Sequence, residues 1–426
     1  MQKLSGKSLL LVSFTLFSMF FGAGNLIFPP HLGAQAGTSL WPAFAGLAVS
    51  AVGLPIAGVV AVARAGGLDK LAGRVHPVFA MVFTILVYLS IGPCLAIPRT
   101  ASTSFQMLVP LIGGGTGLQL AYSVLFFAAA FLVALRPEKL TDWLGRILCP
   151  CLIMLIVVLF AGCLIHPLAA HYGTPSAEYA ALPAVQGILY GYQTMDTLAG
   201  LNFGAVIALN IRARGVTESR AVESGTIRAG FIAGGLLLVV YAMLGHAGAE
   251  TGTVYPGLAT GAEVLTALAQ QLFGRAGLVL IAAIFVIACF NTCVGLIACV
   301  GQYFHQLLPR IPYPAIAAFF AVASMLVSNL GLAAIIRLST PVLNAIYPAA
   351  IVLILLSFMP GLEKHRAVYP LCMGLTALQS IAAALPLGAV SAAANALPLG
   401  SMGFGWVLPA LAGLAGGLLL NKSDLQ

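Results

Sequence analysis

FGAGNLIFPP, residues 21–30, interrupts the first apolar segment of the chain and decides how the rest can fold. Glycine costs about 1 kcal/mol in a helix interior and proline about 3 kcal/mol, so a regular helix is not expected to run through Gly22, Gly24 and the Pro29-Pro30 pair. Inside a bilayer, backbone N–H and C=O groups freed by such a break are tolerated where they line a cavity. The stretch therefore predicts half of a solute and ion site in a membrane protein, with the prolines starting or shaping the next half-helix.

The composition is that of an all-α integral membrane protein. Of the 426 residues, 61% are hydrophobic and 7% are charged, and the mean hydropathy is +1.05. Apolar segments of about 20 residues can cross a bilayer about 30 Å thick. We expect about twelve such spans, over residues 8–36, 40–62, 77–98, 118–135, 146–167, 184–210, 229–248, 276–304, 311–329, 339–359, 369–388 and 402–420.

Basic residues predict the orientation of these spans. The chain has 19 Lys and Arg residues, and all but Arg99, Arg275 and Arg337 fall in alternate loops or at the termini. Cytoplasmic loops carry such an excess, so both termini are expected in the cytoplasm. The net charge of +8 is then a topology signal, and no nucleic-acid partner is implied. A signal peptide over the first 25 residues is an alternative, but its cleavage would disturb this alternation.

Arg99 follows Pro93 and Pro98 at the end of the third span. We expect it near a membrane boundary, either as a snorkelling side chain or as part of a gate.

A second break is expected in YGYQTMDTLAGLNFGAVIALN, residues 190–210. Of 11 acidic residues, Asp196 alone falls well inside a predicted span, where a carboxylate costs about 2.5–3.5 kcal/mol. Such residues are candidates for function. Two interpretations stay open: Asp196 caps the broken half-helix, or it takes part in ion or proton binding. Other polar residues of this break are Gln193, Thr194, Thr197 and Asn202.

Breaks in the first and sixth spans are typical of two five-helix units of opposite orientation, with a binding site between them. The expected units are residues 8–167 and 184–359, followed by two additional helices over 369–420, all in one transmembrane domain covering 1–426. A third polar cluster, Asn291 and Thr292 one turn after Ala288, lies in the eighth span. These side chains could bind an ion or simply bond a neighbouring helix.

No enzyme is expected. His166, His171 and His305 lack an accompanying nucleophile or metal-ligand spacing, and the eight cysteines form no metal or disulfide pattern, which favours buried free thiols.

Four of these stretches resemble the branched-chain amino acid transport system II carriers, sodium-coupled importers of leucine, isoleucine and valine in bacterial cytoplasmic membranes. They are FSMFFGAGNLIFPP (17–30), GPCLAIPRTASTSF (92–105), YGYQTMD (190–196) and ACFNTCVGLI (288–297). The resemblance implies the inverted-repeat fold of LeuT-type transporters in the amino acid-polyamine-organocation superfamily. It implies a multi-pass protein of the bacterial inner membrane that works by alternating access, with lipid as its surroundings and no cofactor besides the coupling ion.

The resemblance also implies a site. Sodium would be held by carbonyls of Ser18, Phe21 and Ala288 and by the side chains of Asn291 and Thr292. The substrate would face Gly22, Ala23, Gly24 and Asn25, together with Thr194, Asp196 and Thr197 of the second break.

The chain departs from the family pattern at Gln106, Gln193, Asn202 and Asn291. Extra amide groups near an aliphatic pocket leave room for another neutral amino acid or a small nitrogenous solute. A separate alternative is coupling to protons in place of sodium, with Asp196 as the leading coupling residue. The oligomeric state is not predicted.

Overall fold

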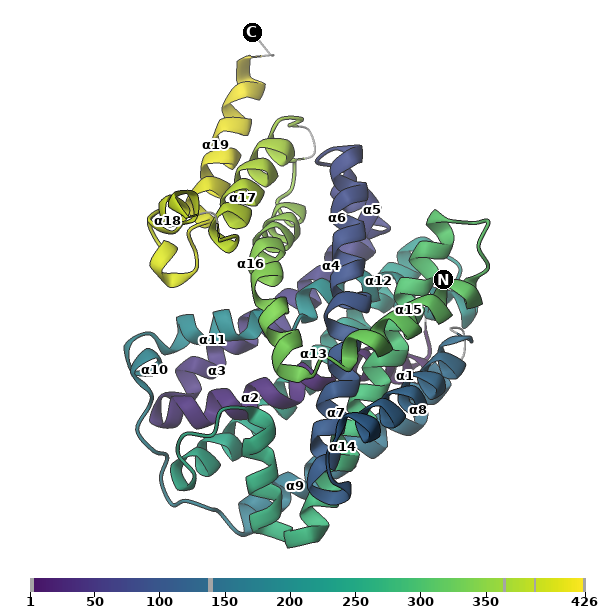
Figure 1. The fold of residues 1–426 in the computed structure, drawn as a ribbon. Helices are drawn as coiled ribbons and strands as arrows, with labels where there is room; N and C mark the ends of the chain where they lie inside the picture. The colour runs from purple at the N-terminus through teal and green to yellow at the C-terminus, as the bar shows by residue number, and fades with distance from the viewer. Residues whose placement is uncertain (1–3, 137–140, 363–364, 387, 424–426) are drawn as a thin grey trace.

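The computed structural model describes residues 4–136, 141–362, 365–386 and 388–423, and these form helices and connecting turns (Figure 1). Lys3, Lys139 and Lys364, which contribute to the predicted charge alternation, lie outside the described residues. The helices are α1 Gly6–Phe20, α2 Ala23–Ala36, α3 Leu40–Ala48, α4 Leu54–Ala65, α5 Leu68–Gly73, α6 Pro77–Leu89, α7 Ala96–Ile112, α8 Thr116–Ala134, α9 Cys149–Ile165, α10 Ala177–Ala181, α11 Pro183–Tyr192, α12 Asp196–Ala213, α13 Ser219–Val254, α14 Gly261–Leu307, α15 Tyr313–Ser328, α16 Leu332–Ser357, α17 Val368–Ala384, α18 Ala389–Asn395 and α19 Val407–Ser423.

The helices match the expected apolar segments. Within the described residues, 7 helical runs are long and apolar enough to cross a membrane, and the bent pair α11–α12 brings the number to 8. Four shorter apolar helices, α1, α15, α17 and α19, account for the remaining expected spans. One of the 7 runs, Ala23–Ala65, contains both α2 and the α3–α4 span, and the chain turns between them at Gly37, whose φ is +46°. The prediction of an all-α, multi-span membrane protein is confirmed.

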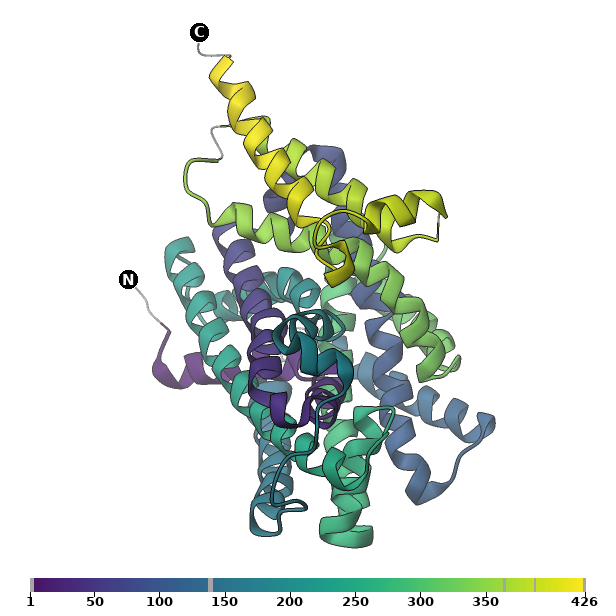
Figure 2. The same cartoon turned by 90° about the vertical axis from the view of Figure 1, so that its left-hand side faces the viewer.

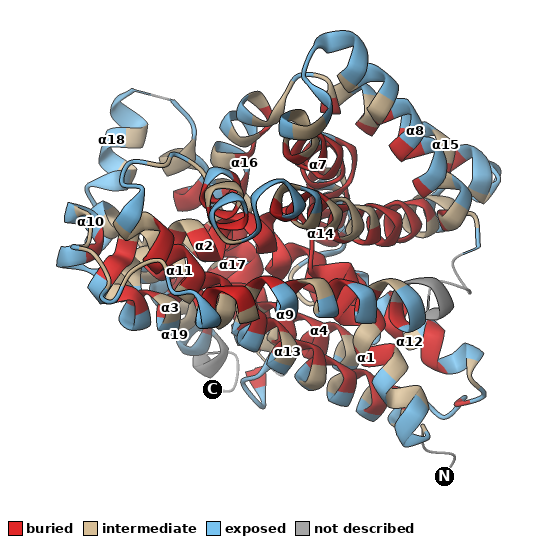
Figure 3. Ribbon diagram, turned by 90° about the horizontal axis from the view of Figure 1, so that it is seen from below, coloured by how far each residue is buried: buried red, intermediate tan, exposed pale blue. Residues whose placement is uncertain are grey.

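The surface fits a lipid environment. Large apolar side chains on the peripheral helices point outward, and several are about two-thirds exposed, including Leu125, Met154, Phe319 and Leu378. Figure 3 shows the buried residues gathered along α1, α2, α7 and α14, with exposed residues on α8, α10, α15 and α18. An apolar surface of this extent would be unfavourable in water, as expected of a protein whose helices cross a membrane.

The two broken helices pack in a reciprocal way. Both halves of the first, α1 and α2, contact α13, while the halves of the second, α11 and α12, contact α3 and α4 respectively. Two units related by a pseudo-twofold axis would produce such an exchange of partners. The unit boundaries at 8–167 and 184–359 stay a prediction. The helices α17 and α19 pack on each other at one end of the molecule, and α17 joins them to α16 (Figures 1 and 2).

Small residues allow α2 and α13 to approach closely. A Cβ added to Gly248 of α13 would lie 2.0 Å from the carbonyl oxygen of Pro30, and one added to Gly33 would lie 2.0 Å from that of Gly245. Pro29 and Pro30 lie inside α2, whose first residue is Ala23, so they shape this half-helix and do not start it. The broken helix is therefore held rigidly against α13 beyond the break.

We predict that Gly248→Ala destabilises the protein by about 1–3 kcal/mol, because the added methyl group overpacks against the Pro30 carbonyl. Gly235→Ala in the same helix is the matched control, since a Cβ there meets nothing within 4 Å. Thermal unfolding of the purified proteins in detergent should show a lower Tm for Gly248→Ala alone; equal Tm values would contradict the packing.

Candidate functional site

The first break lies between α1 and α2. Phe21 (φ −74°, ψ 88°) and Gly22 (φ −126°, ψ −154°) leave the helical conformation. The Gly22 N–H, which would donate to the Ser18 carbonyl in a continuous helix, donates instead to Asn25 Oδ1 at 3.0 Å. Asn25 thus caps the start of α2 and leaves the Ser18 carbonyl without its helical donor.

The second break lies between α11 and α12, which are bent by 50°. Buried Met195 adopts a left-handed conformation with φ +67°, which is uncommon for a residue with a side chain and marks local strain. The hydroxyl of Thr194 donates to the Gly191 carbonyl at 2.8 Å, so this side chain stabilises the end of α11.

Asn25 and Asp196 join the two breaks directly. The amide Nδ2 of Asn25 donates to Asp196 Oδ2 and to the hydroxyl of Tyr241 on α13. That hydroxyl in turn donates to Asp196 Oδ2 at 3.1 Å. All three side chains are buried. Among the described residues, the Asp196 carboxylate accepts hydrogen bonds from side chains of two other helices and from no backbone N–H of α12.

Arg99 lies buried at the second break, so the interpretation as a snorkelling side chain was wrong, and its part in a gate stays a prediction. Its side chain, on α7, is 4% exposed. Nη1 donates to the Gln193 carbonyl at 2.9 Å and Nη2 to the Thr194 carbonyl at 3.3 Å, while the guanidinium lies 5.7 Å from the ring centre of Phe28. Carbonyls freed by the break need donors, and the arginine meets that need.

Helix α14 connects to the last turn of α1. Asn291 Nδ2 donates to Ser18 Oγ at 2.6 Å, and Thr292 Oγ1 donates to the Met19 carbonyl at 3.0 Å. Asn291 Oδ1 is buried without a hydrogen-bond partner, and Ala288 is buried one turn earlier. An unpaired amide oxygen beside a released Ser18 carbonyl is a donor set that suits a hard cation.

A small cavity of about 20 Å³ lies between the two breaks. Its lining includes the predicted residues Gly22, Ala23, Gly24, Asn25, Thr194, Asp196 and Thr292. It also includes Arg99 and the apolar residues Met19, Phe20, Ile91, Ala96, Ala199, Phe203 and Leu296.

The other predicted site residues do not line this cavity. Thr197 donates to the Ser50 carbonyl at 3.4 Å and faces the neighbouring span. Ser18, Phe21, Ala288 and Asn291 are buried and do not line the cavity. Their role as sodium ligands stays a prediction.

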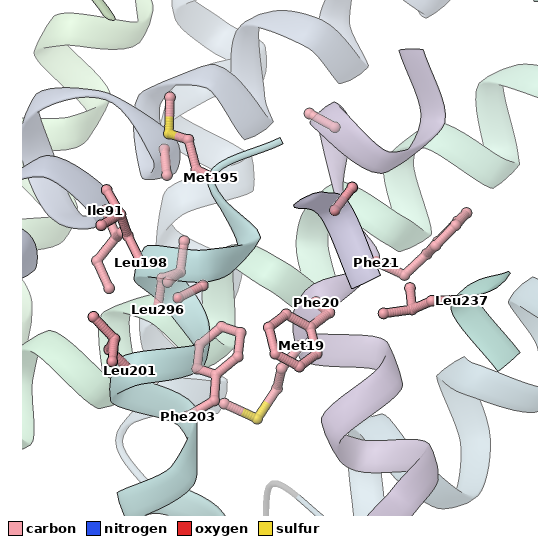
Figure 4. Close-up of a cluster of buried hydrophobic side chains, with 14 of the residues drawn as sticks. Met19, Phe20, Phe21, Ile91, Met195, Leu198, Leu201, Phe203, Leu237 and Leu296 are labelled. Atoms are coloured by element: carbon pink, nitrogen blue, oxygen red, sulfur yellow. The ribbon is translucent and has the colours of Figure 1, made fainter. Parts of the chain in front are cut away.

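Two aromatic pairs link the halves of the two broken helices. Phe20 and Phe203 meet between α1 and α12 with ring centres 5.1 Å apart (Figure 4). Phe28 and Tyr190 meet between α2 and α11, also at 5.1 Å.

Two larger cavities, here called vestibules, are lined by the two parts of the bent pair α11–α12. One of about 770 Å³ is lined by residues of α2, α11 and α16, and one of about 550 Å³ is lined by residues of α4, α12 and the start of α13. The second break thus separates two vestibules.

Sequence reasoning missed Tyr241 and the part that Arg99 plays. A lone tyrosine in an apolar helix carries no signal of function. The signal at Arg99 was its place in a proline-broken span, but only the fold shows that the freed carbonyls it meets belong to another helix.

A multi-span protein with two broken helices, whose unwound ends meet at a small cavity, has the architecture of a secondary transporter. Comparison with known proteins identifies the particular family. Residues 5–424 match the family described as "Branched-chain amino acid transport protein", and the chain belongs to that family.

Relatives extend over nearly the whole chain. The "Branched-chain amino acid permease BraB" of Bacillus subtilis is 39% identical over 426 residues, covering 97% of this chain and 96% of the relative. The "Branched-chain amino acid transport system 2 carrier protein" of Pseudomonas aeruginosa is 42% identical over 364 residues, covering 85% and 83%. The protein is a membrane transporter and not an enzyme.

Solved structures agree on the fold. The nucleobase-cation-symport-1 family transporter Mhp1, in a closed conformation with bromovinylhydantoin bound, superimposes with a TM-score of 0.64 at 11% identity, over 97% of this chain and 93% of that one. MhsT in complex with L-phenylalanine gives a TM-score of 0.55 at 16% identity, over 99% of each chain.

We predict that Arg99→Lys destabilises the protein by about 1.5–3 kcal/mol, because a single ammonium nitrogen does not reproduce the planar fork with which two guanidinium nitrogens reach the two carbonyls. Arg275→Lys is the control, since Arg275 is exposed. The Tm in detergent should fall for Arg99→Lys only, and an unchanged Tm would mean that these hydrogen bonds contribute little.

Proposed function

We propose that this protein imports leucine, isoleucine and valine across a bacterial cytoplasmic membrane by sodium symport, through alternating access, with both termini in the cytoplasm. The observation that carries the proposal is the cavity bounded by both helix breaks, with Asn25 bonded to Asp196 across it. The names of the curated relatives support the substrate class.

The start of α2 suits an amino-acid carboxylate. The first N–H groups of a helix lack intrahelical acceptors and carry the positive end of its dipole. At this start, Gly24 is packed so closely that an added Cβ would lie 2.8 Å from Arg99 Nη2. Ala23 and Gly24 nevertheless line the cavity, so no bulky side chain of their own separates their N–H groups from a ligand there.

The substrate ammonium group needs acceptors, and the second break supplies them. The carbonyls of Gln193 and Thr194 are the first choice and the Asp196 carboxylate is the second. In this conformation Arg99 donates to both carbonyls. Substrate binding would then require that Arg99 moves away from these carbonyls, or that the substrate ammonium group binds the Asp196 carboxylate instead. The aliphatic side chain would pack among Ile91, Phe203 and Leu296, which already line the cavity.

The cavity volume supports alternating access. About 20 Å³ is room for about one water molecule and not for leucine. Entry from either vestibule requires the helix halves on that side to separate, at Phe28 and Tyr190 or at Phe20 and Phe203. The two aromatic contacts are our candidates for the alternating gates.

The sodium ion would bind between the last turn of α1 and α14. Carbonyls of Ser18, Phe21 and Ala288, with oxygens of Asn291 and Thr292, form the proposed ligand set. The unpartnered Asn291 Oδ1 supports it. Because Gly22 touches Thr292, with an added Cβ only 2.5 Å from Oγ1, an ion there would stabilise the same backbone turn that binds the substrate.

Proton coupling is the second candidate, and one observation favours it. Asp196 is buried, receives hydrogen bonds from the neutral side chains of Asn25 and Tyr241, and makes no ion pair within 4.0 Å among the described residues. A carboxylate in such surroundings can exchange a proton as part of a transport cycle.

We predict that Asn25→Ala and Thr292→Ala reduce leucine uptake at least tenfold and weaken its sodium dependence, because both residues hold the proposed ion-coupled turn. Radiolabelled leucine uptake into proteoliposomes with an imposed sodium gradient measures this. Thr376→Ala, a buried threonine of α17 that bonds its own helix, is the control and should keep wild-type uptake.

Wild-type uptake that ignores sodium but follows a proton gradient would overturn the sodium assignment. In that case Asp196→Asn should abolish the response to the proton gradient.

We also predict that unlabelled leucine, isoleucine and valine compete with labelled leucine, with valine about fourfold weaker than isoleucine, because one buried CH₂ contributes about 0.8 kcal/mol. Stronger competition by asparagine, glutamine or another polar amino acid would show that Gln193 and nearby amides define a different substrate.

A further inference from the structure

A second polar cluster lies away from the transport site, between α9 and α13. Cys163 of α9 and Glu250 of α13 are buried, and His246 of α13 lies one turn before Glu250. Their ligand atoms all lie within 4.8 Å of one another. None of the three lines the central cavity or either vestibule. The spacing of the cysteines could not predict this group, because Cys163 and Glu250 are 87 residues apart in the chain.

The distances suit a tetrahedral metal ion. Cys163 Sγ lies 3.3 Å from Glu250 Oε2, and His246 Nε2 lies 3.2 Å from Glu250 Oε1. Zinc bonds of about 2.0 Å to N or O and about 2.3 Å to S place tetrahedral ligands about 3.3–3.5 Å apart. His246 Nε2 is buried without a hydrogen-bond partner and faces the carboxylate. The Glu250 carboxylate therefore lies at a ligand-to-ligand distance from both the thiol and the imidazole, through a different oxygen in each case.

Neighbouring groups hold these ligands in place. His246 Nδ1 lies 2.6 Å from the hydroxyl of Tyr172; when Nδ1 carries the proton and donates it there, Nε2 presents its lone pair to a metal. The Leu168 N–H donates to Glu250 Oε2 at 3.1 Å. Both partners belong to the segment after α9, which covers the cluster. Tyr172 is only partly buried, which gives an ion a path from the solvent.

Charge also favours a divalent ion. A thiolate and a carboxylate together carry two negative charges, and the imidazole is neutral. A bound divalent cation therefore makes the whole complex neutral, which favours its burial in an apolar environment. The thiol proton leaves to solvent when the sulfur binds. The combination of sulfur, imidazole and carboxylate favours zinc or a similar transition metal over magnesium or calcium.

We propose that Cys163, His246 and Glu250 form a binding site for a zinc-type divalent cation that clamps α9 to α13. The fourth position is left for water. Because α13 packs on both α1 and α2, the clamp stabilises the helix that supports the first break.

The test uses the purified full-length protein in detergent, freed of metal by a chelator and dialysed against zinc chloride, with bound zinc measured by elemental analysis. One zinc per chain is expected for the wild type. The Tm should rise by several degrees with zinc but not with magnesium. The variants Cys163→Ser, His246→Gln and Glu250→Gln should bind at least tenfold more weakly. Cys149→Ser, another buried cysteine of α9, is the matched control and should bind as the wild type does.

Cobalt(II) gives a second readout, because a cobalt–thiolate bond produces a charge-transfer absorption that Cys163→Ser must remove. His246 is 22% exposed, so His246→Gln is expected to fold even if Cys163→Ser does not, and it decides the question in that case. The proposal is overturned if the wild type binds no zinc at micromolar concentration, or if these variants bind it as tightly as Cys149→Ser. Neither readout depends on transport.

Discussion

The architecture depends on the side chain of Asn25. Its amide oxygen accepts the N–H that the break at Gly22 releases, and its amide nitrogen donates to Asp196 at the second break. Each helix interruption would be unfavourable inside a membrane by itself. The Asn25 side chain forms hydrogen bonds at both interruptions and so stabilises them together. Tyr241 adds α13 to this network and connects the breaks to the helix on which both halves of the first broken helix pack.

In this structure, side chains of the protein form hydrogen bonds with the backbone carbonyls that the two helix breaks free. Arg99 holds the carbonyls of the second break, and Thr292 holds the Met19 carbonyl at the first. These internal hydrogen bonds occupy groups that a solute or an ion could use. Under the proposed cycle, ligands exchange with protein donors at the same atoms, so the polar groups stay satisfied while the helix halves move.

The charged groups of the centre have different surroundings. Arg99 is bonded to carbonyls and lies over an aromatic ring, whereas Asp196 accepts from an amide and a hydroxyl. A buried charge is costly without partners, and both side chains have them. The buried carboxylate of Glu250, between α9 and α13, likewise has hydrogen-bond partners: it accepts from the Cys163 thiol and from the Leu168 N–H.

The amino-acid sequence by itself determined the membrane class, the approximate span positions and the two breaks, since apolar length, Gly, Pro and a lone intramembrane Asp196 are local properties of the chain. It also indicated Asn291 and Thr292 as neighbours of the first break. Only the tertiary structure decided that Asn25 meets Asp196, that Arg99 is buried against the second break, that Thr197 faces Ser50 and that Cys163 meets Glu250. These contacts join residues 87 to 171 positions apart, and helix packing, which no local pattern encodes, brings them together.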